Sequence, residues 1–310
     1  MKYCYANRRH VLYPDANDSW RAAPAAYTDE FLDRTRDMGF DGIEIGIDVL
    51  EATGGDRRNV TAFTKRLATA KVPVVALRSG GSLTDGRYGP ANQERLARAI
   101  KLAGWAGIGI VNGALSAPPR YPGKPLFSPG FSKSQDSSRE ASLADYRELA
   151  AALRKACDLG AADGVTISVE VHQNSIVDNS WSAVRTVEMV DRKNFGINPD
   201  LGNIFWVYDV PEETCEAAIK ALAPHSVYWH CKNLIRVHHP ENERTVFLRV
   251  PIPDGEIDYR FAISAMVAAD YRGYMAIEGV QSGDQFHGDG KSIAYAKGVV
   301  ADLDRRAKKR

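Results

Sequence analysis

Short apolar segments, many of them rich in β-branched residues, alternate with longer amphipathic segments along the chain. Most of the short segments are continuously apolar, which is typical of parallel strands covered on both faces. The longer segments show the three-to-four-residue spacing of helices that bury one side. This pattern predicts eight strands, at residues 2–6, 42–47, 72–78, 108–112, 166–171, 195–198, 226–231 and 274–278.

The strict alternation of strand and helix indicates the fold class. Eight such units favour a closed (β/α)8 barrel over an open doubly wound sheet, and no glycine-rich dinucleotide-binding fingerprint follows the first strand. We therefore expect one TIM barrel domain spanning residues 1–310, with extended βα loops at its C-terminal face. The longest of these loops, residues 113–138 and 232–257, follow strands and are expected to form lids or substrate walls.

The composition narrows the environment in which the protein works. The 310 residues include 40 basic and 39 acidic side chains. This balance gives no sign of the excess positive charge that binds nucleic acid or an anionic membrane. Four scattered cysteines without a CxxC pair suit a reducing compartment. No window resembles a membrane span, and residues 1–20 lack the apolar run of a signal peptide. We therefore expect a cytoplasmic location.

Four consecutive predicted strands end in side chains that bind metals. Glu170 and Glu278 end the fifth and eighth strands, Asp200 follows the sixth, and His230 lies at the end of the seventh. Because the carboxyl ends of barrel strands meet at one mouth, these groups are expected to converge. One buried acid or histidine is often only structural, but three converging carboxylates would repel one another without a cation. The pattern therefore predicts one divalent-metal site. Its ligands favour Mn²⁺, ahead of Mg²⁺, Co²⁺ and Fe²⁺, with Zn²⁺ left open.

His172 is the first candidate for general acid–base catalysis. It lies two residues after Glu170 on the same strand face, and an unperturbed imidazole pKa near 6.5 suits proton transfer at neutral pH. An equally weighted alternative is that His172 only orients Glu170. Glu170 and Glu278 are the other candidates for moving a proton.

Basic side chains near the predicted mouth are candidate substrate contacts. Arg249 can clamp a substrate hydroxyl or a phosphate with its planar guanidinium group, and Lys232, two residues after His230, can stabilise an oxyanion. A surface ion pair and simple solvation are the respective alternatives. His10, in the first loop, is a further candidate. Glu44 in the second strand is either a substrate contact or part of a polar layer inside the barrel.

These motifs resemble the xylose isomerase-like barrel superfamily of sugar isomerases and epimerases, which also contains endonuclease-IV-type enzymes. The resemblance implies one divalent metal, often Mn²⁺, held by the matching Glu, Asp, His and Glu, with two of these ligands flanking the substrate carbon. Family members commonly have a histidine where this chain has Asn203, which we take as a candidate substrate contact. The motifs that carry the resemblance are Asp41-Gly42-Ile43-Glu44-Ile45, Glu170-Val171-His172, Asp200-Leu201-Gly202-Asn203, His230, Pro253-Asp254-Gly255-Glu256-Ile257-Asp258 and Glu278.

A narrower resemblance concerns the reaction. The strand-five motif Glu-Val-His, the opening Tyr5-Ala6-Asn7-Arg8-Arg9-His10 and the altered strand-six motif are similar to the catalytic α subunits of C-glycoside deglycosidases. This resemblance implies a carbon–carbon lyase that acts on 3-keto C-glycosides and works with a small β subunit. The alternatives are a ketose 3-epimerase or aldose–ketose isomerase, and a non-catalytic sugar- or metal-binding subunit. We also expect an oligomer.

Overall fold

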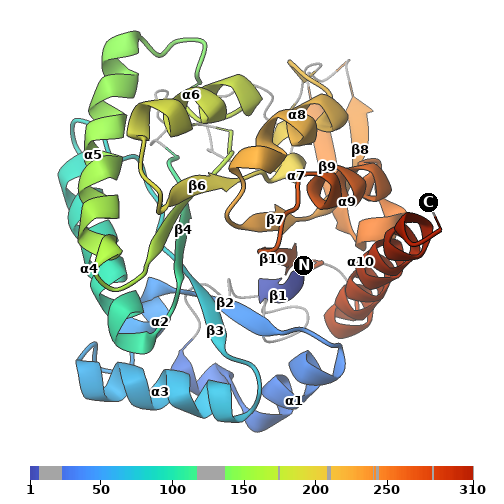
Figure 1. Cartoon of the computed structure of the whole chain (residues 1–310), viewed down its shortest axis with the longest axis horizontal. Coiled ribbons are helices and arrows are strands. Elements are labelled where there is room, and N and C mark those ends of the chain that lie inside the picture. The colour runs from blue at the N-terminus through green and yellow to red at the C-terminus, as the bar shows by residue number, and fades with distance from the viewer. Residues whose placement is uncertain are drawn as a thin grey trace.

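A parallel sheet that closes almost completely into a barrel forms the centre of the computed structural model (Figure 1). The structure describes residues 1–6, 23–116, 137–173, 175–207, 211–239, 241, 244–280 and 283–309. Within these residues the eight barrel strands run in the order β6-β5-β4-β3-β2-β1-β10-β7. Their bounds are β1 (Lys2–Ala6), β2 (Gly42–Gly46), β3 (Val74–Arg78), β4 (Ile110–Ala114), β5 (Thr166–Glu170), β6 (Phe195–Asn198), β7 (Trp229–Cys231) and β10 (Tyr274–Glu278).

The barrel closes between β6 and β7. Ile197 and Ser226 form an isolated parallel bridge, and the Val227 N–H donates to the Ile197 carbonyl at 3.0 Å. The expectation of a single (β/α)8 barrel is therefore confirmed. In each of β1, β5 and β10, four of the five residues are buried, as expected for strands with protein on both sides.

Helices surround the sheet, and most of them begin at a side chain that accepts a backbone N–H (Figure 1). At the start of α5 (Leu143–Ala161), Ser142 and Asp145 form a reciprocal capping box, which satisfies N–H groups that have no partner inside the helix. The longer helices are α1 (Asp29–Asp37), α3 (Arg57–Thr69), α4 (Gly89–Ala106), α5 (Leu143–Ala161), α6 (Ser180–Val190), α8 (Cys215–Leu222), α9 (Tyr259–Ala268) and α10 (Gln285–Ala307). Shorter elements are α2 (Ile47–Glu51), α7 (Leu201–Phe205) and the 3-10 turns η2 (Pro24–Ala26), η3 (Ala223–His225) and η5 (Ile252–Asp254).

The segment predicted as a long loop after the seventh strand is largely a β-hairpin. β8 (Asn233–His239) pairs antiparallel with β9 (Arg244–Val250), and Leu234 lies opposite Arg249. Phe247 packs on Trp206 with ring centroids 5.8 Å apart, and the Arg249 guanidinium lies 5.5 Å from the centre of the same indole. The hairpin thus brings Arg249 and two aromatic rings together.

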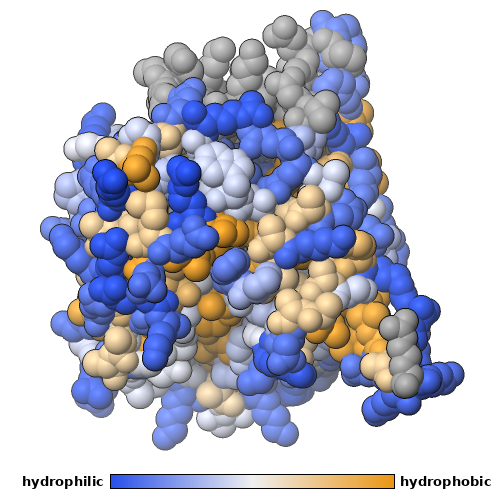
Figure 2. All heavy atoms as spheres, turned by 45° about the horizontal axis from the view of Figure 1, so that its top comes forward, coloured by the Kyte–Doolittle hydropathy of each residue, from blue (hydrophilic) through white to orange (hydrophobic). Residues whose placement is uncertain are grey.

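Two sequence-based predictions fall on parts of the chain that are not described. His10 lies outside the described residues, as do residues 117–136 of the predicted loop at 113–138. In the described part of the chain, no helix combines the length and the apolar character needed to cross a membrane. The face shown in Figure 2 mixes hydrophilic and apolar side chains.

Candidate metal centre

The four side chains predicted as metal ligands converge at the carboxyl ends of the barrel strands. They are Glu170 of β5, Asp200 after β6, His230 of β7 and Glu278 of β10, and all four are buried. One ligand atom from each lies within 4.8 Å of the others. Metal–oxygen distances near 2.1 Å place opposite ligands of an octahedral ion about 4 Å apart, so the cluster has close to the size of one divalent ion.

The short helix α7 aims the carboxylate of Asp200. Asp200 is the N-cap of this helix, and its Oδ1 accepts the Gly202 N–H at 2.9 Å. Its Oδ2 contacts the ammonium group of Lys232. A Cβ at position 202 would overlap the Lys232 side chain, so glycine is required for the lysine to pass. The sequence Asp-Leu-Gly therefore fixes the carboxylate and leaves room for its partner.

The ring of His230 faces the ligand cluster with one nitrogen and the barrel interior with the other. Its Nδ1 lies 3.5 Å from Oε1 of both Glu170 and Glu278, and its Nε2 lies 2.5 Å from Glu44 Oε2. Although burial acts to lower it, the pKa of His230 is raised to about 10 by Glu44 and Glu170. A proton on this ring compensates the carboxylates, and a divalent ion can displace it from the nitrogen that faces them.

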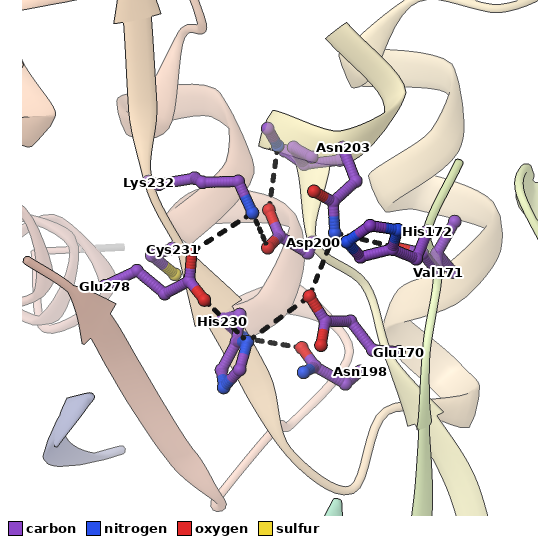
Figure 3. A network of polar contacts seen from close by, with 12 residues as sticks. Glu170, Val171, His172, Asn198, Asp200, Asn203, His230, Cys231, Lys232 and Glu278 are labelled. Atoms are coloured by element: carbon purple, nitrogen blue, oxygen red, sulfur yellow. Dashed lines mark hydrogen bonds and ion pairs between the residues drawn. The ribbon is translucent and has the colours of Figure 1, made fainter. Parts of the chain in front are cut away.

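Lys232 and Arg249, the predicted substrate contacts, lie beside Glu278. The Lys232 Nζ is 3.1 Å from Glu278 Oε2, and an Arg249 terminal nitrogen is 3.3 Å from the same oxygen (Figure 3 shows the lysine). Both basic side chains are buried. They do not form the surface contacts that were considered as alternatives. Their charges offset carboxylates that would otherwise repel one another.

Arg78 is a residue of the site that the sequence analysis missed. It ends β3, and its Nη1 lies 3.1 Å from Glu170 Oε2 and 3.9 Å from Glu278 Oε1. Burial acts to raise the pKa of Glu170, but Arg78 and His230 hold it well below its usual range. Its place at the end of a barrel strand puts it at the mouth, but a lone arginine in the sequence does not show which carboxylates it contacts.

Asn203 and His172 lie close to Glu170 (Figure 3). Asn203 Nδ2 donates to Glu170 Oε1 at 2.9 Å and to the Val171 carbonyl at 3.0 Å, so its amide group holds the end of β5. His172 Nδ1 donates to the Gln173 carbonyl at 2.7 Å, which leaves its Nε2 with a lone pair. Burial lowers the pKa of His172 to about 4, so this imidazole is neutral at pH 7. A substrate contact through Asn203 Oδ1 stays a prediction.

Comparison with known proteins identifies the family. Residues 32–297 match the family model described as a xylose isomerase-like TIM barrel. The chain belongs to the xylose isomerase-like TIM barrel family. The superfamily resemblance predicted from the strand-end motifs is therefore confirmed. No curated protein matches the sequence.

Solved structures of other proteins share the xylose isomerase-like barrel along nearly their whole length. A xylose isomerase-like protein from Mycobacterium smegmatis in complex with magnesium is 21% identical, with 97% of each chain covered and a TM-score of 0.73. An L-ribulose 3-epimerase is 19% identical, with 99% of this chain and 97% of that chain covered and a TM-score of 0.71. A 3-keto-D-glucoside 4-epimerase from E. coli is 17% identical, with 96% and 99% covered and a TM-score of 0.67. At these identities, the likeness to these structures shows the fold alone.

The donor set of this xylose isomerase-like barrel fits a divalent metal. Three carboxylates and one imidazole form the mixed oxygen and nitrogen set that first-row divalent ions and Mg²⁺ accept. Cys231, which directly follows His230, packs in the apolar core as the strand alternation predicts, so it adds no thiolate to the set. The described cluster can therefore hold one divalent ion.

Proposed function

We propose that the protein is a divalent-metal-dependent enzyme that removes a proton beside a sugar carbonyl. The observation that carries this proposal is the convergence of Glu170, Asp200, His230 and Glu278 in one buried cluster. The epimerases among the similar structures act on sugars, and the mycobacterial structure contains magnesium, which supports a metal-dependent sugar enzyme. Mn²⁺ is the ion we expect, with Mg²⁺, Co²⁺, Fe²⁺ and Zn²⁺ as alternatives.

The buried charges around the cluster suit a reaction that passes through an anion. A divalent ion held there would supply a Lewis acid to a sugar carbonyl or hydroxyl and stabilise the developing enolate. Arg249 and Lys232, both buried beside Glu278, are the proposed donors to substrate oxygens. Positive charge fixed in a buried site stabilises an anion more strongly than it would in water.

His172 is the proposed base. Its Nδ1 proton is engaged by the Gln173 carbonyl, and Nε2 is the nitrogen that can accept a proton. Glu170 and Glu278 both lie beside basic side chains, and the pKa of Glu170 is well below its usual range. The low pKa weakens Glu170 as a base, which favours the neutral imidazole of His172 in this role.

The specific reaction that we propose is the cleavage of 3-keto C-glycosides. The base takes the proton from the sugar carbon next to the carbonyl. The resulting electron pair forms a carbon–carbon double bond as the bond to the aromatic aglycone breaks, and the aryl carbon takes up a proton. Trp206 and Phe247, beside Arg249, offer aromatic faces for the aglycone. A small second subunit belongs to this hypothesis.

The epimerase neighbours favour an alternative reaction on free sugars. In a ketose 3-epimerase or an aldose–ketose isomerase, Glu170 and Glu278 would exchange a proton with neighbouring carbons. A third candidate, a non-catalytic sugar- or metal-binding subunit, predicts metal binding without turnover.

The metal content of the purified protein tests the shared part of the proposal. We expect about one divalent ion per chain after incubation with Mn²⁺, and loss of this ion in Glu170→Gln and His230→Ala. Incubation in D₂O with 3-keto C-glycosides and with free ketoses then separates the reactions. Released aglycone supports the lyase, and deuterium in recovered ketose supports the epimerase or isomerase. His172→Gln should abolish the lyase reaction and keep the metal. Wild-type protein that binds no divalent ion contradicts the whole proposal.

A further inference from the structure

The imidazole ring of His230 rests on a buried polar network inside the barrel. Its members are Glu44 of β2, Asn112 of β4, Asn198 of β6 and Tyr228, which precedes β7. Each of the four is at most 1% exposed. Buried polar side chains cost stability unless their hydrogen bonds are made, so a network of this kind specifies one arrangement of its members.

The directions of the hydrogen bonds follow from one donor that cannot be reversed. The backbone N–H of His230 can only donate, so Asn198 Oδ1, 2.6 Å away, accepts. Asn198 must then present its Nδ2 to Asn112 Oδ1 at 3.2 Å. This turns Asn112 Nδ2 towards Glu44 Oε1 at 3.4 Å. Both amide orientations are therefore set by the network.

Glu44 is the acceptor at the end of this chain of hydrogen bonds. Its Oε2 accepts the Tyr228 hydroxyl at 2.8 Å and faces His230 Nε2 at 2.5 Å. The Asn112 Nδ2, 3.5 Å from the same ring nitrogen, is a donor and offers Nε2 no acceptor. His230 Nε2 therefore carries a hydrogen and donates it to Glu44.

The other ring nitrogen lies on the side of the ligand cluster. His230 Nδ1 is 3.5 Å from Oε1 of both Glu170 and Glu278. A histidine binds a metal through the lone pair of one nitrogen, and the hydrogen bond of the other nitrogen decides which one it is. The carboxylate on the far side of the ring thus determines the ligand atom on the near side.

We propose that Glu44 is a positioning residue that keeps a proton on His230 Nε2 and thereby presents Nδ1 to the metal. Asn112 holds the Glu44 carboxylate directly, and Asn198 orients Asn112. The inference rests on the metal site of the proposed function. Carboxylates that accept the N–H of a ligand histidine fix its ring and raise its basicity, and their loss costs roughly 10- to 100-fold in metal affinity.

Calorimetric titration of the metal-free full chain with Mn²⁺ tests the role of Glu44. We expect Glu44→Gln to weaken Mn²⁺ binding by about 10-fold or more. Asp289→Asn is the matched control, because Asp289 is also a fully buried carboxylate and accepts a tyrosine hydroxyl, that of Tyr5, at 2.6 Å. Both variants should lose thermal stability, but the control should keep its Mn²⁺ dissociation constant within about twofold. Equal dissociation constants in Glu44→Gln and wild type would overturn the proposal.

A measurement on the wild-type protein decides the same question if Glu44→Gln does not fold. Nitrogen-15 NMR of histidine-labelled protein loaded with diamagnetic Zn²⁺ is expected to show His230 protonated at Nε2 and metal-bound at Nδ1. The reverse assignment would overturn the positioning role. Wild-type protein that binds neither Mn²⁺ nor Zn²⁺ would instead overturn the proposed function, so the two failures are distinguishable.

Discussion

Lys232 is the side chain whose replacement best separates the metal-free protein from the metal-bound one. Its ammonium group contacts Asp200 and lies 3.1 Å from Glu278 Oε2, and the residue is 3% exposed. Lys232→Met keeps the long apolar stem and removes the charge. We predict that this change destabilises the metal-free protein and tightens Mn²⁺ binding, because two ligand carboxylates lose a competing cation.

The size of the effect follows from the geometry. Two unit charges separated by the 3.1 Å between Lys232 and Glu278 attract by about 5 kcal/mol at an effective dielectric constant of 20. Removing one partner of a buried pair typically costs about 3–5 kcal/mol, since the other charge stays buried. If the bound ion replaces half of the lost attraction, Lys232→Met destabilises the metal-bound protein by about 2 kcal/mol less than the metal-free protein. This corresponds to roughly 30-fold tighter Mn²⁺ binding.

Denaturant unfolding in EDTA and in saturating Mn²⁺ measures the stability of the metal-free and of the metal-bound protein. Calorimetric titration measures the Mn²⁺ dissociation constant independently. Lys291→Met is the matched control, because Lys291 pairs with Asp254 at 2.6 Å and its side chain is 48% exposed. Exposed pairs contribute about 0–1 kcal/mol, and the control should leave Mn²⁺ affinity unchanged. Equal destabilisation of Lys232→Met in EDTA and in Mn²⁺, with an unchanged dissociation constant, would refute the electrostatic reasoning.

Two further predictions concern packing and pH. Gly113→Ala places a Cβ against the Ser79 carbonyl oxygen, so we expect urea unfolding to show a loss of about 3 kcal/mol. At Gly107, where φ is +68° and the space is open, alanine should cost only about 1 kcal/mol; equal losses would contradict this reasoning. Burial raises the pKa of Asp178 to about 6, above the value near 3.9 of an unfolded chain, so its ionisation between about pH 4 and 6 costs stability. The free energy of unfolding of Asp178→Asn should therefore exceed that of the wild type by up to about 3 kcal/mol at pH 7.5. This difference should vanish near pH 4. A difference that does not change with pH would contradict the prediction.

The barrel was predictable from the sequence because its strands are buried on both faces and leave continuous apolar segments. β1, β6 and β10 have the predicted bounds. The hairpin of β8 and β9 was missed because it lies outside the barrel, and its alternating sequence was interpreted as a loop beside Pro240 and Pro253. Alternation over a few residues is a weaker signal than a continuous apolar run.

The positions of the four ligands could be predicted from the sequence, but the side chains that contact them could not. Each of Glu170, Asp200, His230 and Glu278 lies at or just after a strand end, and the closure of the barrel brings strand ends together. Arg78 also ends a strand, but a single basic residue gives no sign of the carboxylate that it will meet. The network of Glu44 and Asn112 depends on side-chain directions across the barrel, which no linear spacing encodes.

The charges of the described side chains around the cluster link the metal to the proposed chemistry. The acidic groups Glu44, Glu170, Asp200 and Glu278 face the basic groups Arg78, Lys232 and Arg249, and a proton on His230 completes the balance. A divalent ion held by the four ligands would add two positive charges and, in place of this proton, remove one, so the described groups and the ion would together carry a net charge of +1. A neutral sugar would gain little from that excess, whereas an enolate would be stabilised by it. Binding energy realised only when charge develops on the substrate accelerates the chemical step. The three basic side chains are therefore as much a part of the expected chemistry as the four ligands.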